Sequence, residues 1–230
     1  YGKSKEGNYV EFSRLSPKFE QGFPGDLEQR IRYTLTDNNE LIIDYRMATN
    51  ETTVVNPTNH TYFNLNGQDN GNILQHRLEI YANSFLEIDE DFVPTGNILN
   101  VENTPMDFRI KKIIGKQIDY NDVQIRRAKG YDHNYVFTND GKLKKMAKLY
   151  CDESGITMTV YSDLCGMQLY TGNFLDGVVG KGGTRYEEKA GICFETQYYP
   201  NACNEEHFPS SVLKAGQTYK SRTIYELAVS

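Results

Sequence analysis

The sequence predicts an all-β protein built from antiparallel strands. Seventeen Tyr and eleven Phe supply much of the bulky apolar surface, and aromatic residues suit a pleated, half-buried strand. Short stretches that alternate polar and apolar side chains are separated by turns rich in Asn, Asp and Gly. No long segment repeats its apolar residues every 3.6 positions, as an amphipathic helix does. With 230 residues and no internal repeat or linker, we expect one domain over residues 1–230.

The first predicted hairpin pairs residues 28–35 with residues 41–49 through the turn Asp37-Asn38-Asn39. The last predicted strand, residues 218–229, alternates regularly, and we expect it to close a sheet. Residues 113–120 have the composition for one or two helical turns.

Three further segments are predicted to form a meander. Residues 135–137 lead through Asn139-Asp140-Gly141 into residues 146–151, which makes a second hairpin. The turn Asp152-Glu153-Ser154-Gly155 then joins this strand to residues 156–162.

Charge and hydropathy exclude two classes of partner. The net charge of −6 leaves no excess of cations to neutralise phosphates, so we expect no nucleic-acid partner. No apolar run approaches the ~20 residues that span a bilayer, and no signal peptide is visible, so we expect no membrane association. The four cysteines form no C-x-x-C motif. We expect free thiols, a reducing compartment and therefore a cytoplasmic protein.

Glu195 is the first candidate for chemistry. It lies in the apolar and aromatic run of residues 191–199, which has the character of a buried strand. Burial of an unpaired carboxylate is costly, and it raises the pKa toward the range of a general base. The local sequence leaves open the alternative that Glu195 points outward from an edge strand.

His60 lies among amide, hydroxyl and aromatic side chains in residues 56–65. Amide and phenol groups can hydrogen-bond sugar hydroxyls, and an imidazole can donate or accept a proton near neutral pH. The alternative is a histidine that only fixes a turn. For Asp132 the alternative is a residue of a strand-entry turn, and for Gln168 it is a solvent-facing strand residue.

Five stretches rich in specific polar residues make poor strands, so we expect loops on a sheet scaffold, where functional residues concentrate. They are residues 22–25, 56–67, 130–134, 168–176 and 193–209.

Five ordered motifs between Leu15 and Glu226 resemble the aldose 1-epimerase (galactose mutarotase) family, and the Asn-His-x-Tyr-Phe-Asn string is fairly specific. The motifs are Leu15-Ser16-Pro17 with Gln21-Gly22-Phe23-Pro24-Gly25, Asn56-Pro57-Thr58-Asn59-His60-Thr61-Tyr62-Phe63-Asn64-Leu65, Gly130-Tyr131-Asp132-His133-Asn134, Leu169-Tyr170-Thr171-Gly172-Asn173-Phe174, and Phe194-Glu195-Thr196-Gln197 with Phe208-Pro209-Ser210.

This resemblance implies a large antiparallel β-sandwich of the galactose mutarotase type. It also implies a reaction, the interconversion of the α and β anomers of a free hexose such as galactose or glucose. Glu195 would take the proton from the anomeric hydroxyl and His60 would protonate the ring oxygen. Asp132 and Gln168 would hold sugar hydroxyls, with Tyr62 beside them. The reaction moves only protons, so no cofactor and no metal is expected.

Family members carry an earlier stretch with an arginine and a further histidine that contact the sugar. This chain begins after that region, so we expect a domain truncated at its N-terminus. A non-catalytic carbohydrate-binding remnant of such an enzyme is therefore the main alternative. An epimerase of hexose 6-phosphates would need an arginine cluster, and Arg126-Arg127 is the only close pair. A glycoside hydrolase that uses Glu195 and Asp132 depends on the separation of the two carboxylates.

Overall fold

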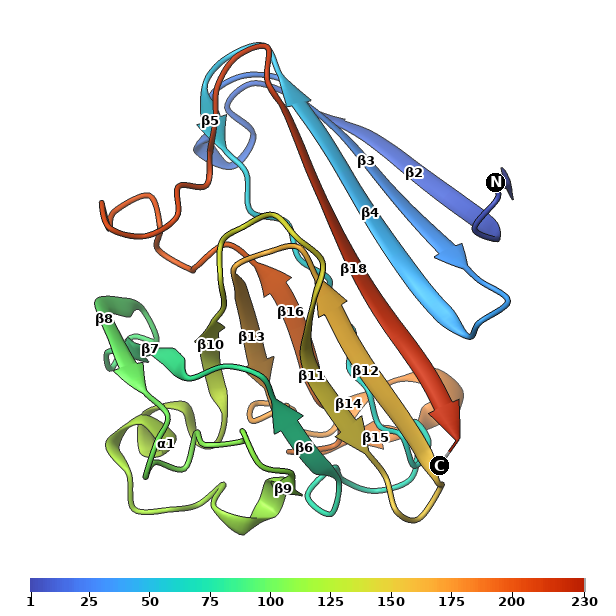
Figure 1. The fold of residues 1–230 in the computed structure, drawn as a ribbon, viewed down its shortest axis with the longest axis vertical. Helices are drawn as coiled ribbons and strands as arrows, with labels where there is room; N and C mark the ends of the chain where they lie inside the picture. Colours follow the sequence, from blue (N-terminus) through green and yellow to red (C-terminus); the bar gives the residue numbers. More distant parts are fainter. Residues whose placement is uncertain (230) are drawn as a thin grey trace.

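The computed structural model describes residues 1–229, which fold around two antiparallel sheets (Figure 1). The larger sheet has nine strands in the order β1-β2-β3-β4-β18-β12-β11-β6-β9. Their bounds are Gly2–Lys3 (β1), Asn8–Ser16 (β2), Leu27–Leu35 (β3), Glu40–Thr49 (β4), Thr218–Val229 (β18), Ile156–Ser162 (β12), Lys144–Tyr150 (β11), Arg77–Ile80 (β6) and Lys112–Ile113 (β9).

The smaller sheet has five strands in the order β16-β13-β10-β7-β8. Their bounds are Cys193–Gln197 (β16), Gly166–Tyr170 (β13), Asp132–Val136 (β10), Ser84–Ile88 (β7) and Pro94–Asn100 (β8). Two short pairs complete the strands, Val178–Val179 (β14) with Arg185–Tyr186 (β15) and Thr53–Val54 (β5) with Val212–Leu213 (β17).

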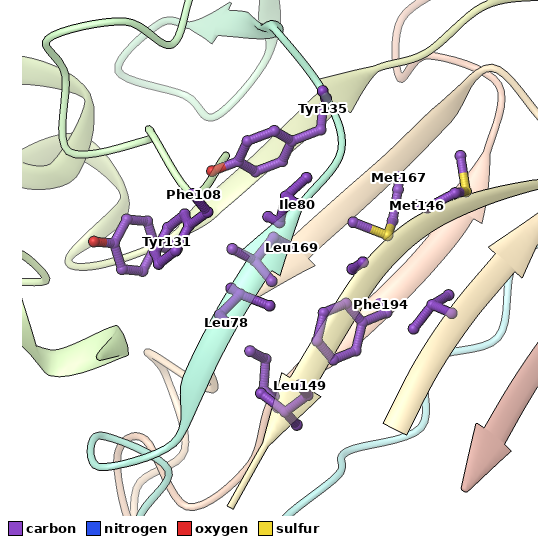
Figure 2. Packing of buried hydrophobic residues seen from close by; sticks show 14 of the residues in the cluster. Leu78, Ile80, Phe108, Tyr131, Tyr135, Met146, Leu149, Met167, Leu169 and Phe194 are labelled. Carbon is purple, nitrogen blue, oxygen red and sulfur yellow. The ribbon is translucent and has the colours of Figure 1, made fainter. Parts of the chain in front are cut away.

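The two sheets enclose one large hydrophobic core, so the predicted sandwich is confirmed (Figure 2). Alternate residues of each strand face the partner sheet, as the period of two in a strand requires. The larger sheet contributes Leu78, Ile80, Met146 and Leu149, and the smaller sheet contributes Tyr135, Met167, Leu169 and Phe194. All eight side chains are almost completely buried.

The hairpin predicted for residues 28–35 and 41–49 is confirmed as β3 and β4. The expectation that residues 218–229 close a sheet is wrong. β18 lies inside the larger sheet and pairs with β4 on one side and β12 on the other. β18 therefore connects strands β1–β4 to strands β12 and β11 within the larger sheet.

The predicted meander is half right. β11 and β12 pair through the turn at residues 152–155, but β10 does not pair with β11. β10 pairs with β13 and β7 in the smaller sheet, and the chain then crosses to the larger sheet. Alternation of side chains identifies a strand, but it does not identify which strand becomes its partner.

Helical structure is scarce among residues 1–229. The expected turns at residues 113–120 appear as one 3₁₀ turn, Ile114–Lys116. A six-residue helix, Val123–Ala128 (α1), was not predicted because it is too short to show a period. Asp122 caps it by accepting hydrogen bonds from the backbone N–H groups of Gln124 and Ile125. Further 3₁₀ turns lie at Glu20–Gly22 and Lys181–Gly183. None of the helices in this part of the chain combines the length and the apolar character that crossing a membrane requires.

Candidate active site

The outer face of the smaller sheet carries the candidate site. In β16, Phe194 enters the core and the Thr196 hydroxyl meets Thr223 of the larger sheet at 2.5 Å. Because side chains alternate along a strand, Cys193 and Glu195 point to the opposite face. The edge strand β16 thus buries its apolar side in the core and carries the thiol of Cys193 and the carboxylate of Glu195 on the opposite face.

Strand register brings the polar residues of three strands together. Glu195 lies opposite Gln168 of β13, and Cys193 lies opposite Tyr170 of the same strand. Asp132 of β10 lies opposite Tyr170 on the other side. The Gln168 amide donates a hydrogen bond to Asp132 Oδ1 at 2.7 Å, which fixes both side chains beside Glu195.

The segment that carries His60 runs along the free edge of β16. Asn56 exchanges two hydrogen bonds with the backbone of Tyr198, at 3.1 and 2.8 Å. Further on, the Thr58 hydroxyl donates to the carbonyl of Thr196, and Phe63 forms a bridge with Ile192. These anchors on both sides of His60 place its ring over the outer face of the sheet.

The His60 ring touches two residues of β16 through its two nitrogens. His60 Nε2 lies 3.4 Å from Glu195 Oε1, and His60 Nδ1 lies 3.4 Å from Cys193 Sγ. The side chain of His60 is 49% exposed, whereas that of Glu195 is 11% exposed. A buried carboxylate is therefore paired with an imidazole that reaches solvent.

Burial sets the proton affinity of the carboxylates. The pKa of Glu195 is raised to about 7, mainly by desolvation, with His60 opposing the rise and the nearby charge of Asp132 adding to it. Desolvation also raises the pKa of Asp132, while the hydrogen bond from Gln168 and the proximity of His60 lower it. The site therefore holds a carboxyl group that exchanges its proton near neutral pH.

Aromatic rings surround the pair. The His60 ring centroid lies 5.1 Å from that of Tyr62 and 5.8 Å from that of Tyr170. Phe174 stacks on Tyr170 with centroids 6.4 Å apart. Tyr62 also lines a neighbouring cavity of about 590 Å³, whose other walls include Leu175 and Tyr186. Ring faces of this kind suit the apolar face of a pyranose.

The structure brings together all five residues that the sequence predicted for the site. His60 contacts Glu195 and Tyr62, and Gln168 is hydrogen-bonded to Asp132, whose charge acts on Glu195. Three of the stretches expected to be loops are strands only in part, because residues 132–134 lie in β10, residues 168–170 in β13 and residues 193–197 in β16. Their polar residues face outward from a sheet whose other side is apolar, and local composition does not separate that pattern from a loop.

Two neighbours were missed. Cys193 and Tyr170 both belong to the site by position, because Cys193 lies on the same face of β16 as Glu195, and Tyr170 lies opposite both Cys193 and Asp132. The spacing of two between Cys193 and Glu195 could have predicted the first, since both then share one face of the strand. No sequence signal links Tyr170 to His60, because the contact depends on strand pairing.

A β-sandwich that holds a buried carboxylate against an imidazole, with amide and carboxylate side chains beside them, defines an acid–base site of the kind that binds small polar molecules. The family model described as aldose 1-epimerase matches residues 2–226, and the chain belongs to this family.

Relatives and solved structures agree with this assignment. The chain is 42% identical to galactose mutarotase of Bos taurus over 97% of its own length, and 35% identical to aldose 1-epimerase of Escherichia coli K12 over 94%. It superposes on the crystal structure of a GalM/aldose epimerase homologue from C. elegans with a TM-score of 0.86 and 30% identity, covering 98% of this chain and 66% of that one. The chain spans 64% and 63% of the length of the two curated relatives.

Proposed function

We propose that the protein interconverts the α and β anomers of a free hexose by acid–base opening and closing of the sugar ring. The observation that carries the proposal is the contact of 3.4 Å between His60 Nε2 and Glu195 Oε1. Membership of the aldose 1-epimerase family supports it. Galactose and glucose are the substrates we expect.

The geometry suits the chemistry of an anomeric carbon. Ring opening removes a proton from the anomeric hydroxyl and adds one to the ring oxygen, and both oxygens are bonded to the same carbon. The base and the acid must therefore lie side by side on one side of the sugar, as Glu195 and His60 do. Glu195 accepts the hydroxyl proton while His60 donates to the ring oxygen. Rotation of the free aldehyde and closure on its other face give the second anomer.

The environment of the two groups supports these roles. A base works best when its pKa is close to the working pH, and burial brings the pKa of Glu195 to about 7. The half-exposed His60 ring can exchange its proton with solvent between turnovers. Asp132 and Gln168, joined by their hydrogen bond, offer oxygen and amide groups to the sugar hydroxyls, and Tyr62 adds a ring beside them.

Polarimetry of freshly dissolved α-galactose tests the proposal. The chain should accelerate equilibration of the anomers, and Glu195→Gln or His60→Asn should each lower the rate by about 10²–10⁴-fold, because each removes one proton-transfer group. Glu90→Gln, which alters an exposed turn residue, is the matched control. Equal rates for the two site variants and the control would contradict the assignment.

A second candidate function is sugar binding without catalysis. The 49% exposure of the His60 side chain favours it, because solvent then reaches one member of the acid–base pair. Calorimetric binding of galactose with no faster exchange of anomers than in buffer would select this candidate.

The setting we propose is the cytoplasm. Cys151, Cys165, Cys193 and Cys203 are all free, as a reducing compartment favours. Fractionation of the source cells, with detection of the protein in the soluble fraction, tests this location.

A further inference from the structure

His60, Cys193 and Glu195 together offer an imidazole nitrogen, a sulfur and a carboxylate oxygen. One ligand atom from each residue lies within 4.8 Å of the other two. Nitrogen, sulfur and oxygen donors of this kind are the ligands of zinc, and zinc sites with three protein ligands leave one position open to water or a small molecule. We propose that these three residues bind Zn²⁺, and that the bound ion and a sugar exclude each other.

The distances are close to those of a tetrahedral site. Bonds of about 2.0–2.3 Å place neighbouring ligand atoms of zinc about 3.3–3.6 Å apart. The contacts of His60 with Cys193 and with Glu195 are both 3.4 Å, although they use different ring nitrogens. A rotation of the half-exposed His60 ring brings one nitrogen toward both partners. Cys193 and Glu195 need little movement, because β16 holds them two positions apart on one face.

The charge around the cluster favours a cation. Cys193 lies within the electrostatic reach of two carboxylates, Glu195 and Asp132. Zinc binds the thiolate form, so the ion replaces the proton on Cys193 Sγ and the proton leaves to solvent. His60, the imidazole of the cluster, itself becomes a ligand. Among residues 1–229 no second group of three His, Cys, Asp or Glu side chains is arranged to hold an ion.

The ion would occupy the acid–base pair itself. The His60 nitrogen that binds zinc can no longer carry a proton to the ring oxygen, and a zinc-bound Glu195 is a weaker base. Exclusion of sugar by the ion rests on the proposed function, whereas binding of the ion does not. The cluster would then make anomer exchange sensitive to free zinc.

Two measurements on the metal-free chain test the site without any sugar. Calorimetric titration with zinc chloride should show one ion bound per chain. Titration with Co²⁺ should give the near-ultraviolet charge-transfer absorption of a cobalt–thiolate bond. Cys193→Ser should abolish this absorption and weaken Zn²⁺ binding by more than about 100-fold, which exceeds the usual effect of losing only an outer-shell partner.

Cys203→Ser is the matched control, because it removes an exposed thiol outside the cluster, and it should leave both signals unchanged. His60→Asn gives a second, independent variant with little risk to folding, since the ring is half exposed, and it should weaken Zn²⁺ binding to a similar extent. Absence of binding, or binding that survives both Cys193→Ser and His60→Asn, overturns the site.

Exclusion of the sugar is measured separately. Galactose should reduce the cobalt–thiolate absorption, and Zn²⁺ should slow the exchange of anomers in the wild-type chain. A cobalt signal that saturating galactose leaves unchanged overturns the exclusion while the metal site stands. Failure of the zinc-free chain to exchange anomers counts against the proposed function alone.

Discussion

Replacement of Glu195 by Gln should make the protein more stable at neutral pH while it destroys the proposed base. The side chain is 11% exposed, and burial raises its pKa from an ordinary value of 4.5 to about 7. The folded chain therefore holds the proton of Glu195 more tightly than the unfolded chain does. Stability falls as pH rises from about 4.5 to 7, because over this range unfolding releases the proton.

The magnitude follows from the shift. Each pKa unit corresponds to about 1.36 kcal/mol, so Glu195 lowers the free energy of unfolding by about 3 kcal/mol between these two pH values. Gln has a similar shape and does not ionise, so the Glu195→Gln variant lacks this loss. The two proteins should have similar stability near pH 4.5, and the variant should be about 3 kcal/mol more stable above pH 7.

Urea denaturation of both proteins at several pH values, in buffer with a metal chelator, measures the difference. Glu90→Gln serves as the control, because Glu90 lies in an exposed turn and its loss should not change the pH dependence. Parallel stability curves for the wild type and Glu195→Gln across this pH range would refute the claim that burial controls the proton of Glu195.

Three other predictions concern the same site. The rate of anomer exchange should fall as pH drops below about 7, because only ionised Glu195 accepts a proton, and polarimetry over about pH 5–9 should show this acidic limb. Asp132→Asn should move the limb to lower pH and raise KM, since the Asp132 charge raises the pKa of Glu195; an unmoved limb would count against this coupling. Asn56→Ala should lower the free energy of unfolding by about 1–3 kcal/mol in urea denaturation, because it leaves the Tyr198 backbone groups without their partners, and a smaller loss would show that these bonds do not anchor the segment.

Strand content could be predicted from the sequence more readily than strand pairing. The hairpin of β3 and β4 was predicted because its turn joins two adjacent strands, so that pairing is local. β10 also looked like one arm of a hairpin, yet it joins β13 and β7. Long-range pairing depends on which apolar faces meet across the core, and the alternation of one strand carries no such information.

The candidate site could likewise be predicted in part, because single residues could be recognised from the sequence but the contacts between them could not. Glu195 and His60 were recognised because each lies in a distinctive segment, and the family motifs joined them. Their contact depends on the anchoring of residues 55–65 along β16, which involves Asn56 and Tyr198, 142 positions apart in the chain. Tyr170 entered the site only through the register of β13 with β10 and β16.

The structure of the outer face of the smaller sheet explains why the raised pKa of Glu195 and its cost in stability occur together. Strand β16 must bury Phe194 against the larger sheet, and this requirement fixes Glu195 on the opposite side, two backbone positions from Cys193. The segment that covers this side buries Glu195 and leaves its one basic partner, His60, half exposed. Without the cover, Glu195 would be solvated and would ionise near pH 4.5, too weak a base for a sugar hydroxyl at neutral pH. The same cover creates the free-energy cost that Glu195→Gln should remove, so the loss of stability and the proton affinity of the base have one physical origin.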